Sequence, residues 1–139
     1  MTGCIIGSDD VPFALPPREL ISHLLDLPFP PSINSMHGHG RGRTYRSSEY
    51  VRWIAAADEL LMLDGGLRGR KTIDGRFYAQ ITLTEERWGK VDLDNCSTKA
   101  VLDYAQSRRL IANDRNAWEI QSAWGYAPTG CRLLLGELV

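Results

Sequence analysis

The sequence has few cysteines, no long apolar run and almost no net charge. Its three cysteines, Cys4, Cys96 and Cys131, are scattered and form no CxxC pair, which excludes a disulfide framework and a tetrahedral zinc site. No apolar stretch approaches the roughly 20 residues that cross a bilayer, and the N-terminus lacks a signal-peptide pattern. We therefore expect a cytoplasmic protein with no membrane association. A net charge of −1 does not by itself indicate a nucleic-acid partner.

A length of 139 residues suits one domain. Residues 1–22 carry several prolines without periodicity, so we expect an N-terminal extension of unknown role, followed by a single domain over residues 23–139. The apolar patterns and turn signals predict elements in the order β-α-β-α-β-β. The expected strands cover residues 23–27, 76–84, 117–124 and 131–135, and the expected helices cover about 16 residues from Ser47 or Ser48 and residues 96–107.

Hydrophobic spacing predicts which side of each element is buried. The first helix is expected to bury Val51, Ile54, Ala55, Leu61 and Met62, with Arg52 and Trp53 off that stripe. The strand over residues 76–84 alternates, with one face made by Phe77, Ala79, Ile81 and Leu83. The second helix is expected to bury Val101, Leu102 and Ala105. Residues 33–47 are polar and glycine-rich, which predicts a flexible loop, and among the tryptophans we expect only Trp88 to be exposed.

The segment Asp92-Leu93-Asp94-Asn95 carries the most chemical information. Residues two apart in an extended segment project to one side, so Asp92 and Asp94 are expected to share a site. Such a carboxylate pair, together with substrate phosphates, can hold Mg²⁺. Asp114 is the candidate third ligand. A helix over residues 96–107 rises about 18 Å, and the seven residues that follow can return at most about 23 Å, so the helix must break by about Ser107.

The same segment has a second interpretation, in which it only caps the helix that follows. Acidic residues at a helix N-terminus are stabilised by the helix dipole, and Asp94 or Asn95 is the expected cap. The motif alone does not decide between capping and metal binding.

Three separated motifs resemble those of the RusA-type Holliday junction resolvases. They are LPFPPSIN at residues 27–34, DLDN with Lys99-Ala100 and Asp103 behind it, and Asn113-Asp114-Arg115, and the match spans about residues 24–138. The resemblance implies a compact α+β, RusA-like domain with a small mixed sheet and two main helices, forming a homodimer. It also implies Mg²⁺-dependent nicking of four-way DNA junctions by paired symmetric cuts, with Mn²⁺ able to substitute for Mg²⁺.

The residues matching the family's metal ligands are Asp92, Asp94 and Asp114, and Lys99 matches its active-site lysine. The sequence departs from the family pattern in two places. Three residues rather than two separate Asn95 from Lys99, and Asn113 stands where the family often has an acid. We expect the extra residue to lie in the turn before the helix, so that Lys99 keeps its orientation. Otherwise Lys99 is a solvated lysine paired with Asp103.

Basic residues predict where DNA is contacted, since Lys and Arg bind phosphates by releasing counterions. The expected contacts are Arg41, Arg43, Arg46, Arg52 and Lys90. Two alternatives to the junction resolvase stay open. One is a Mg²⁺-dependent nuclease acting on other branched DNA, and the other is a non-catalytic dimeric module that binds DNA junctions.

Overall fold

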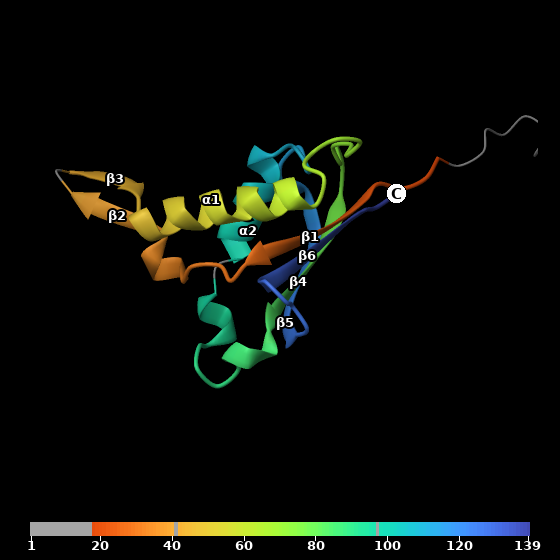
Figure 1. The fold of residues 1–139 in the computed structure, drawn as a ribbon. Coiled ribbons are helices and arrows are strands. Elements are labelled where there is room, and N and C mark those ends of the chain that lie inside the picture. The colour runs from red at the N-terminus through yellow and green to blue at the C-terminus, as the bar shows by residue number, and fades with distance from the viewer. Residues whose placement is uncertain (1–17, 41, 97) are drawn as a thin grey trace, which may run out of the picture.

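Four strands form one mixed sheet, and α1 and α2 lie on the same side of it (Figure 1). The computed structural model describes residues 18–139 without residues 41 and 97, and without the side chains of residues 39 and 43. The described sheet and helices are β1 (Ser22–Pro28), α1 (Ser48–Leu63), β4 (Phe77–Thr84), α2 (Thr98–Ser107), β5 (Ala117–Gly125) and β6 (Gly130–Glu137). This arrangement confirms the predicted α+β class and mixed sheet.

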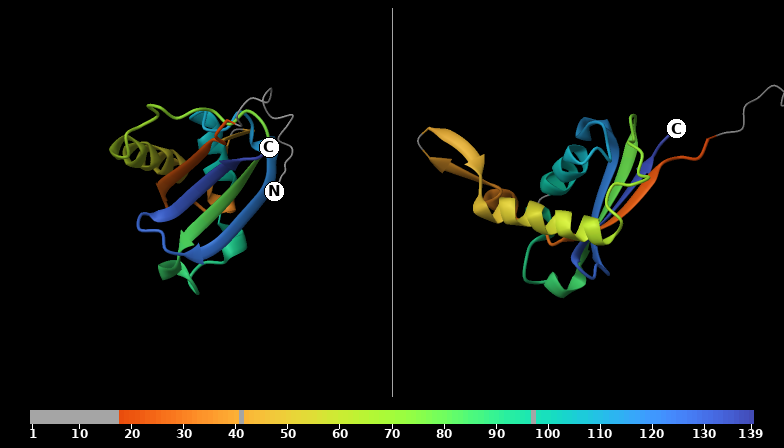
Figure 2. Two further views of the ribbon diagram at one scale, coloured as in Figure 1. Left: turned by 90° about the vertical axis from the view of Figure 1, so that its right-hand side faces the viewer. Right: turned by 45° about the horizontal axis from the view of Figure 1, so that its top comes forward.

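The strands are arranged in the order β1-β6-β4-β5. The edge strand β5 is parallel to β4, whereas the β1–β6 and β6–β4 pairs are antiparallel. The left view of Figure 2 shows the face of the sheet that neither α1 nor α2 covers. Among the described residues, no helix combines the length and the apolar character needed to cross a membrane.

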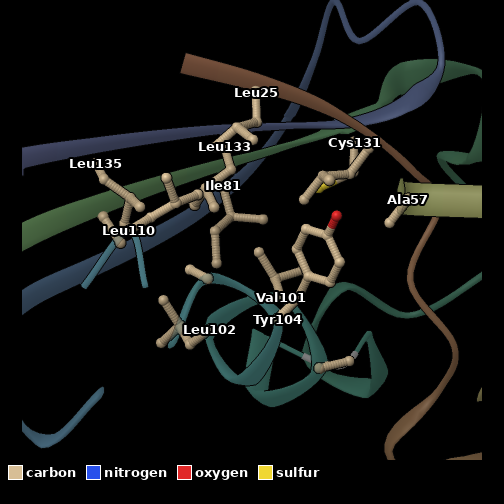
Figure 3. Close-up of a cluster of buried hydrophobic side chains, with 14 of the residues drawn as sticks. Leu25, Ala57, Ile81, Val101, Leu102, Tyr104, Leu110, Cys131, Leu133 and Leu135 are labelled. Carbon is tan, nitrogen blue, oxygen red and sulfur yellow. The ribbon is translucent and has the colours of Figure 1, made fainter. Parts of the chain in front are cut away.

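The covered face of the sheet forms the core (Figure 3). The alternation predicted for β4 is confirmed, because Phe77, Ala79, Ile81 and Leu83 are all buried. The burial predicted for the second helix is also confirmed, and Ala100 and Tyr104 are buried with it. Register places Leu25, Leu133 and Ile81 side by side across three strands. The same row continues onto β5 at Ser122, so the core row becomes polar at the sheet edge.

The buried face of α1 differs from the predicted one. The helix buries Tyr50, Trp53, Ala57 and Leu61, whereas Val51 is 51% exposed and Met62 is 74% exposed. The predicted stripe was wrong because it left out Trp53, whose large ring lies only 5% exposed and whose Nε1 donates to the Pro28 carbonyl at 3.0 Å. Burying an aromatic ring removes more apolar surface from water than burying a valine, and this sets the rotation of the helix.

The segment predicted to be a flexible loop contains a β-hairpin. Strands β2 (His37–Gly40) and β3 (Arg43–Arg46) pair antiparallel and project away from the sheet (Figure 1). The Tyr45 ring lies against Gly38, where a Cβ atom would come within 2.6 Å of the ring. The glycines that suggested flexibility therefore make room for a cross-strand aromatic contact. At the base of the hairpin, the Ser47 amide donates to the Met36 carbonyl at 3.0 Å.

The end of α2 agrees with the prediction from chain geometry. The helix ends at Ser107, and Arg109 adopts a positive φ of 60°, which turns the chain back toward the sheet. The expectation for tryptophans was only partly right. Trp88 is 71% exposed as predicted, but Trp118 is 68% exposed as well. The Arg76 guanidinium covers the Trp118 ring at 4.9 Å, which lets an aromatic side chain remain at the surface.

Residues 1–17 of the expected extension lie outside the described residues. Two residues of the segment that follows, Arg18 and Ile21, form hydrogen bonds with Glu137 at the end of β6. Arg18 donates two hydrogen bonds to the Glu137 carboxylate, at 2.8 and 2.5 Å, and the Ile21 amide donates a third at 2.9 Å. These donors, led by Arg18, lower the pKa of Glu137 from 4.5 to about 2.

This pair predicts a loss of stability in acid. A carboxyl group whose pKa is lower in the folded state stabilises the fold at neutral pH, and this contribution disappears as pH falls from about 4.5 to about 2. Glu137→Gln should be less stable than wild type at neutral pH, and the difference should shrink over that pH range. Urea unfolding of both proteins at several pH values measures this difference in the free energy of unfolding. A difference that stays constant with pH would contradict the assignment.

Candidate active site

Two of the sequence motifs that lie far apart in the chain meet next to the start of α2. Ser32, in the LPFPPSIN motif, forms an isolated antiparallel β-bridge with Cys96, directly after the DLDN motif. Cys96 is 4% exposed, and its thiol donates to the Asp92 carbonyl at 3.5 Å. Burial raises the pKa of this thiol, so Cys96 acts as a neutral anchor of the loop. The contact holds the DLDN motif against the first motif.

The DLDN motif does not have the predicted extended conformation throughout. Asp92 is extended, but Leu93–Asn95 form a 3₁₀ turn, η4, and α2 begins only at Thr98. Asp94 and Asn95 are therefore not the cap of α2, and the capping interpretation was wrong. η4 ends at Asn95, and Lys99 is the second residue of α2. That the extra residue lies before the helix stays a prediction.

Asp92 and Asp94 nevertheless lie on the wall of one cleft. Both line a cleft of about 740 Å³ together with Ile33, Thr98 and Ser122. Both residues are exposed, and within the part of the chain that the structure describes neither carboxylate has a hydrogen-bond or ion-pair partner. Two unpartnered carboxylates thus face a cleft at the edge of the sheet.

Lys99 lies between two further carboxylates. Its ammonium is 3.3 Å from an Asp103 oxygen and 3.9 Å from an Asp114 oxygen. Asp114 begins the 3₁₀ turn η5 (Asp114–Asn116), directly before β5 as expected. The position of its backbone is fixed, because its amide donates to the Gln106 side-chain oxygen at 2.8 Å. Lys99 therefore points toward a residue of the third motif, and it also forms the simpler pair with Asp103.

The oxygen donors of the cleft suit a hard divalent cation, because Mg²⁺ is commonly held by one or two carboxylates, water and substrate phosphates. Asp92 and Asp94 supply that pair on the cleft wall. The full set of three ligands is not assembled, since no three His, Cys, Asp or Glu residues among those described form a group that could hold a metal. Asp114 instead lies beside the Lys99 ammonium. The donor set fits a two-carboxylate site more closely than the three-carboxylate site expected from the sequence.

The predicted DNA contacts are only partly described. Arg41 and the side chain of Arg43 lie outside the described residues. Arg46, Arg52 and Lys90 are all exposed, and the Arg46 guanidinium lies over the Tyr50 ring at 5.5 Å. Arg46 therefore remains accessible at the junction between the hairpin and α1. Whether these side chains contact DNA stays a prediction.

Two residues of the cleft were missed from the sequence, Thr98 and Ser122. Ser122 could have been found, because alternation along residues 117–124 puts it on the same side as Ile120 and Trp124. A small polar residue at a core-facing position indicates that the hydrophobic core does not extend to that position and that a cleft can form there. Thr98 carries no such signal, since a threonine at the start of a helix is common.

Comparison with known proteins adds no further assignment. No protein-family model matches the chain, and no curated protein matches it. The resemblance to the RusA-type resolvases therefore rests on the three sequence motifs.

Proposed function

We propose that this protein is a Mg²⁺-dependent DNA endonuclease of the RusA type, which resolves four-way junctions as a homodimer. The observation that carries the proposal is the cleft in which Asp92 and Asp94 lie exposed, with no hydrogen-bond or ion-pair partner among the residues that the structure describes. Carboxylates that stabilised a helix or an ion pair would have partners in the structure. These two are available to an external cation, and they belong to the motif that resembles the family's metal-binding segment.

In the proposed reaction, Asp92 and Asp94 would hold Mg²⁺, and Asp114 would contribute from the side of Lys99. A cation held there would supply Lewis acidity toward a phosphate oxygen and would lower the pKa of a water molecule. The negative charge of the two carboxylates also repels phosphate when no cation is present, which makes DNA cleavage depend on the metal. The hydroxyl groups of Thr98 and Ser122 line the same cleft and can donate hydrogen bonds to phosphate oxygens.

Lys99 would neutralise the attacked phosphate. Its side chain is 66% exposed and its ammonium already lies within 3.9 Å of Asp114, so it can move to a phosphate without breaking buried contacts. Arg46, Arg52 and Lys90, with Arg41 and Arg43, would bind the flanking backbone. A homodimer would present two such sites with two-fold symmetry, which matches the symmetry of a four-way junction.

Removing the Lys99 ammonium should separate the two roles considered for this residue. Lys99→Ala should change the free energy of unfolding by no more than about 0.5 kcal/mol, because an exposed pair with Asp103 contributes little. It should reduce the nicking rate by roughly 100-fold, as expected when a donor to the reacting group is lost. Lys71→Ala, which removes another exposed lysine, is the matched control. If Lys99→Ala nicked at the wild-type rate, the only role left for Lys99 would be its ion pair with Asp103.

The proposed function is tested by incubating the purified chain with synthetic four-way junctions, forks and linear duplexes in Mg²⁺, in Mn²⁺ and in EDTA. We expect symmetric nicks in the four-way junction, dependent on the metal, and little cutting of the duplex. Stronger cutting of forks or flaps would favour a nuclease for other branched DNA. Binding of the junction without nicking in either metal would favour the non-catalytic module and overturn the proposal.

A further inference from the structure

A second hollow, of about 360 Å³, lies next to the cleft that contains Asp92 and Asp94. Its apolar wall includes Phe29, Trp53 and Val91, and its polar groups include Ser35 and Glu49. Its volume falls in the range of small-molecule sites, which are mostly apolar with a few placed polar groups. The size and the lining both suit a flat heterocycle.

The two hollows share a wall. Val91 lines the second hollow, and the next residue, Asp92, lines the cleft. In the segment that is bridged to Cys96, Ser32 lines the hollow and the next residue, Ile33, lines the cleft. The β-bridge also joins Ser32, which lines the hollow, to Cys96, which lines the cleft. A nucleotide whose phosphate lay in the cleft could place its base in the adjoining hollow.

The side chains of the hollow can hold a base by stacking. The Arg87 guanidinium lies over the Phe29 ring at 4.3 Å, so the wall of the hollow includes a stacked cationic and aromatic pair. Unpaired bases stack on aromatic rings and on guanidinium planes in proteins that bind single strands. Trp53 is 5% exposed and donates its Nε1 hydrogen bond to Pro28, so the inner wall is held rigidly.

The polar side of the hollow is an acceptor. Glu49 is exposed, and one oxygen of its carboxylate accepts from the Ser35 hydroxyl at 3.0 Å. A carboxylate has about four acceptor positions, so most remain open to a ligand. A carboxylate accepts hydrogen bonds from the exocyclic amino group of a base and has none to donate to a base carbonyl.

We propose that this hollow takes an unpaired nucleobase with an exocyclic amino group, from a nucleotide next to the scissile phosphate. The base stacks on the outer face of the Phe29–Arg87 pair, and Glu49 accepts a hydrogen bond from its amino group. The inference rests on the proposed function and deepens it, because it makes Glu49 a specificity-determining residue. Cutting would then depend on the base next to the cut as well as on the shape of the junction.

The test uses four-way junctions nicked by the wild-type protein, with the bases on either side of the nick replaced one at a time by analogues that lack the amino group. One such replacement should reduce the rate of wild-type nicking by roughly tenfold, the usual effect of losing one hydrogen bond to a charged group. Glu49→Gln should nick more slowly than wild type and should discriminate less than about threefold between base and analogue. Glu59→Gln, an exposed carboxylate on the same helix, should discriminate like wild type.

The outcomes separate this inference from the proposed function. If wild type nicks all the substituted junctions at equal rates, the inference is overturned and the endonuclease proposal stands. The same holds if Glu49→Gln discriminates as strongly as wild type. If wild type nicks no junction in Mg²⁺ or Mn²⁺, the endonuclease proposal fails and the inference fails with it.

Discussion

Asp94→Asn is expected to reduce Mg²⁺-dependent nicking of a four-way junction by more than about 100-fold, because the Lewis-acid contribution at stake is worth several kcal/mol. The substitution keeps the size of the side chain and removes its charge. Asp94 is exposed and has no hydrogen-bond or ion-pair partner among the described residues, so the fold should be unaffected. Binding of the junction should stay the same or become tighter, since one negative charge near the phosphates is lost.

Three measurements on the same protein preparation decide this prediction. They are the single-turnover nicking rate, the affinity for the uncut junction, and the free energy of unfolding. Glu119→Gln is the matched control, because it neutralises an exposed carboxylate on β5 that pairs only with Gln121 among the described residues, at 2.9 Å. Nicking by Asp94→Asn at the wild-type rate would contradict the metal site. Loss of both nicking and stability would instead show that Asp94 supports the fold.

Tyr104→Ala is expected to destabilise the fold by about 3–5 kcal/mol, which is typical when a buried aromatic side chain is deleted. Tyr104 is 2% exposed and links the two helices. Its ring meets the Trp53 ring of α1 edge to face, with 5.7 Å between centroids. Its hydroxyl donates to Asp58 of α1 at 2.7 Å, and Arg108 donates to both oxygens of the same carboxylate at 2.8 and 2.7 Å. Burial and the contact with Asp58 both raise the pKa of Tyr104, so the hydroxyl stays protonated as a donor.

The parts of this contact can be separated by a smaller change. Tyr104→Phe keeps the ring and removes one hydrogen bond, and should cost about 1 kcal/mol, because Arg108 still satisfies the Asp58 carboxylate. Tyr126→Ala is the control, since Tyr126 is 71% exposed and should change stability by less than about 0.5 kcal/mol. Chemical denaturation measures all three proteins. Equal stability of Tyr104→Ala and Tyr126→Ala would show that the two helices are held together elsewhere.

Much of the secondary structure could be predicted because its causes are local. Alternation along β4 follows from strand geometry, and Phe77, Ala79, Ile81 and Leu83 were correctly placed on one face. The start of α1 was predicted from Ser47, whose hydroxyl accepts from the Tyr50 amide at 3.1 Å. The end of α2 was predicted from chain length alone. In the site, Asp92 and Asp94 line one cleft, although Leu93–Asn95 form a turn in place of the predicted extended segment.

Other features were decided by contacts between residues that are distant in sequence. The rotation of α1 depends on Trp53 reaching Pro28, and the hairpin depends on the fit of Tyr45 against Gly38. The bridge from Ser32 to Cys96 joins two motifs that no periodicity relates.

The sequence by itself determined where the four strands of the main sheet and the two α-helices run, which face of β4 is buried, and which acidic residues are candidates for the site. Only the tertiary structure decided that Asp92 and Asp94 share a cleft with Ser122, while Asp114 lies beside Lys99. The physical reason is that hydrophobic periodicity is a property of neighbours along the chain. The position of a carboxylate relative to a cleft depends on how separate elements pack, and that packing minimises exposed apolar surface over the whole domain.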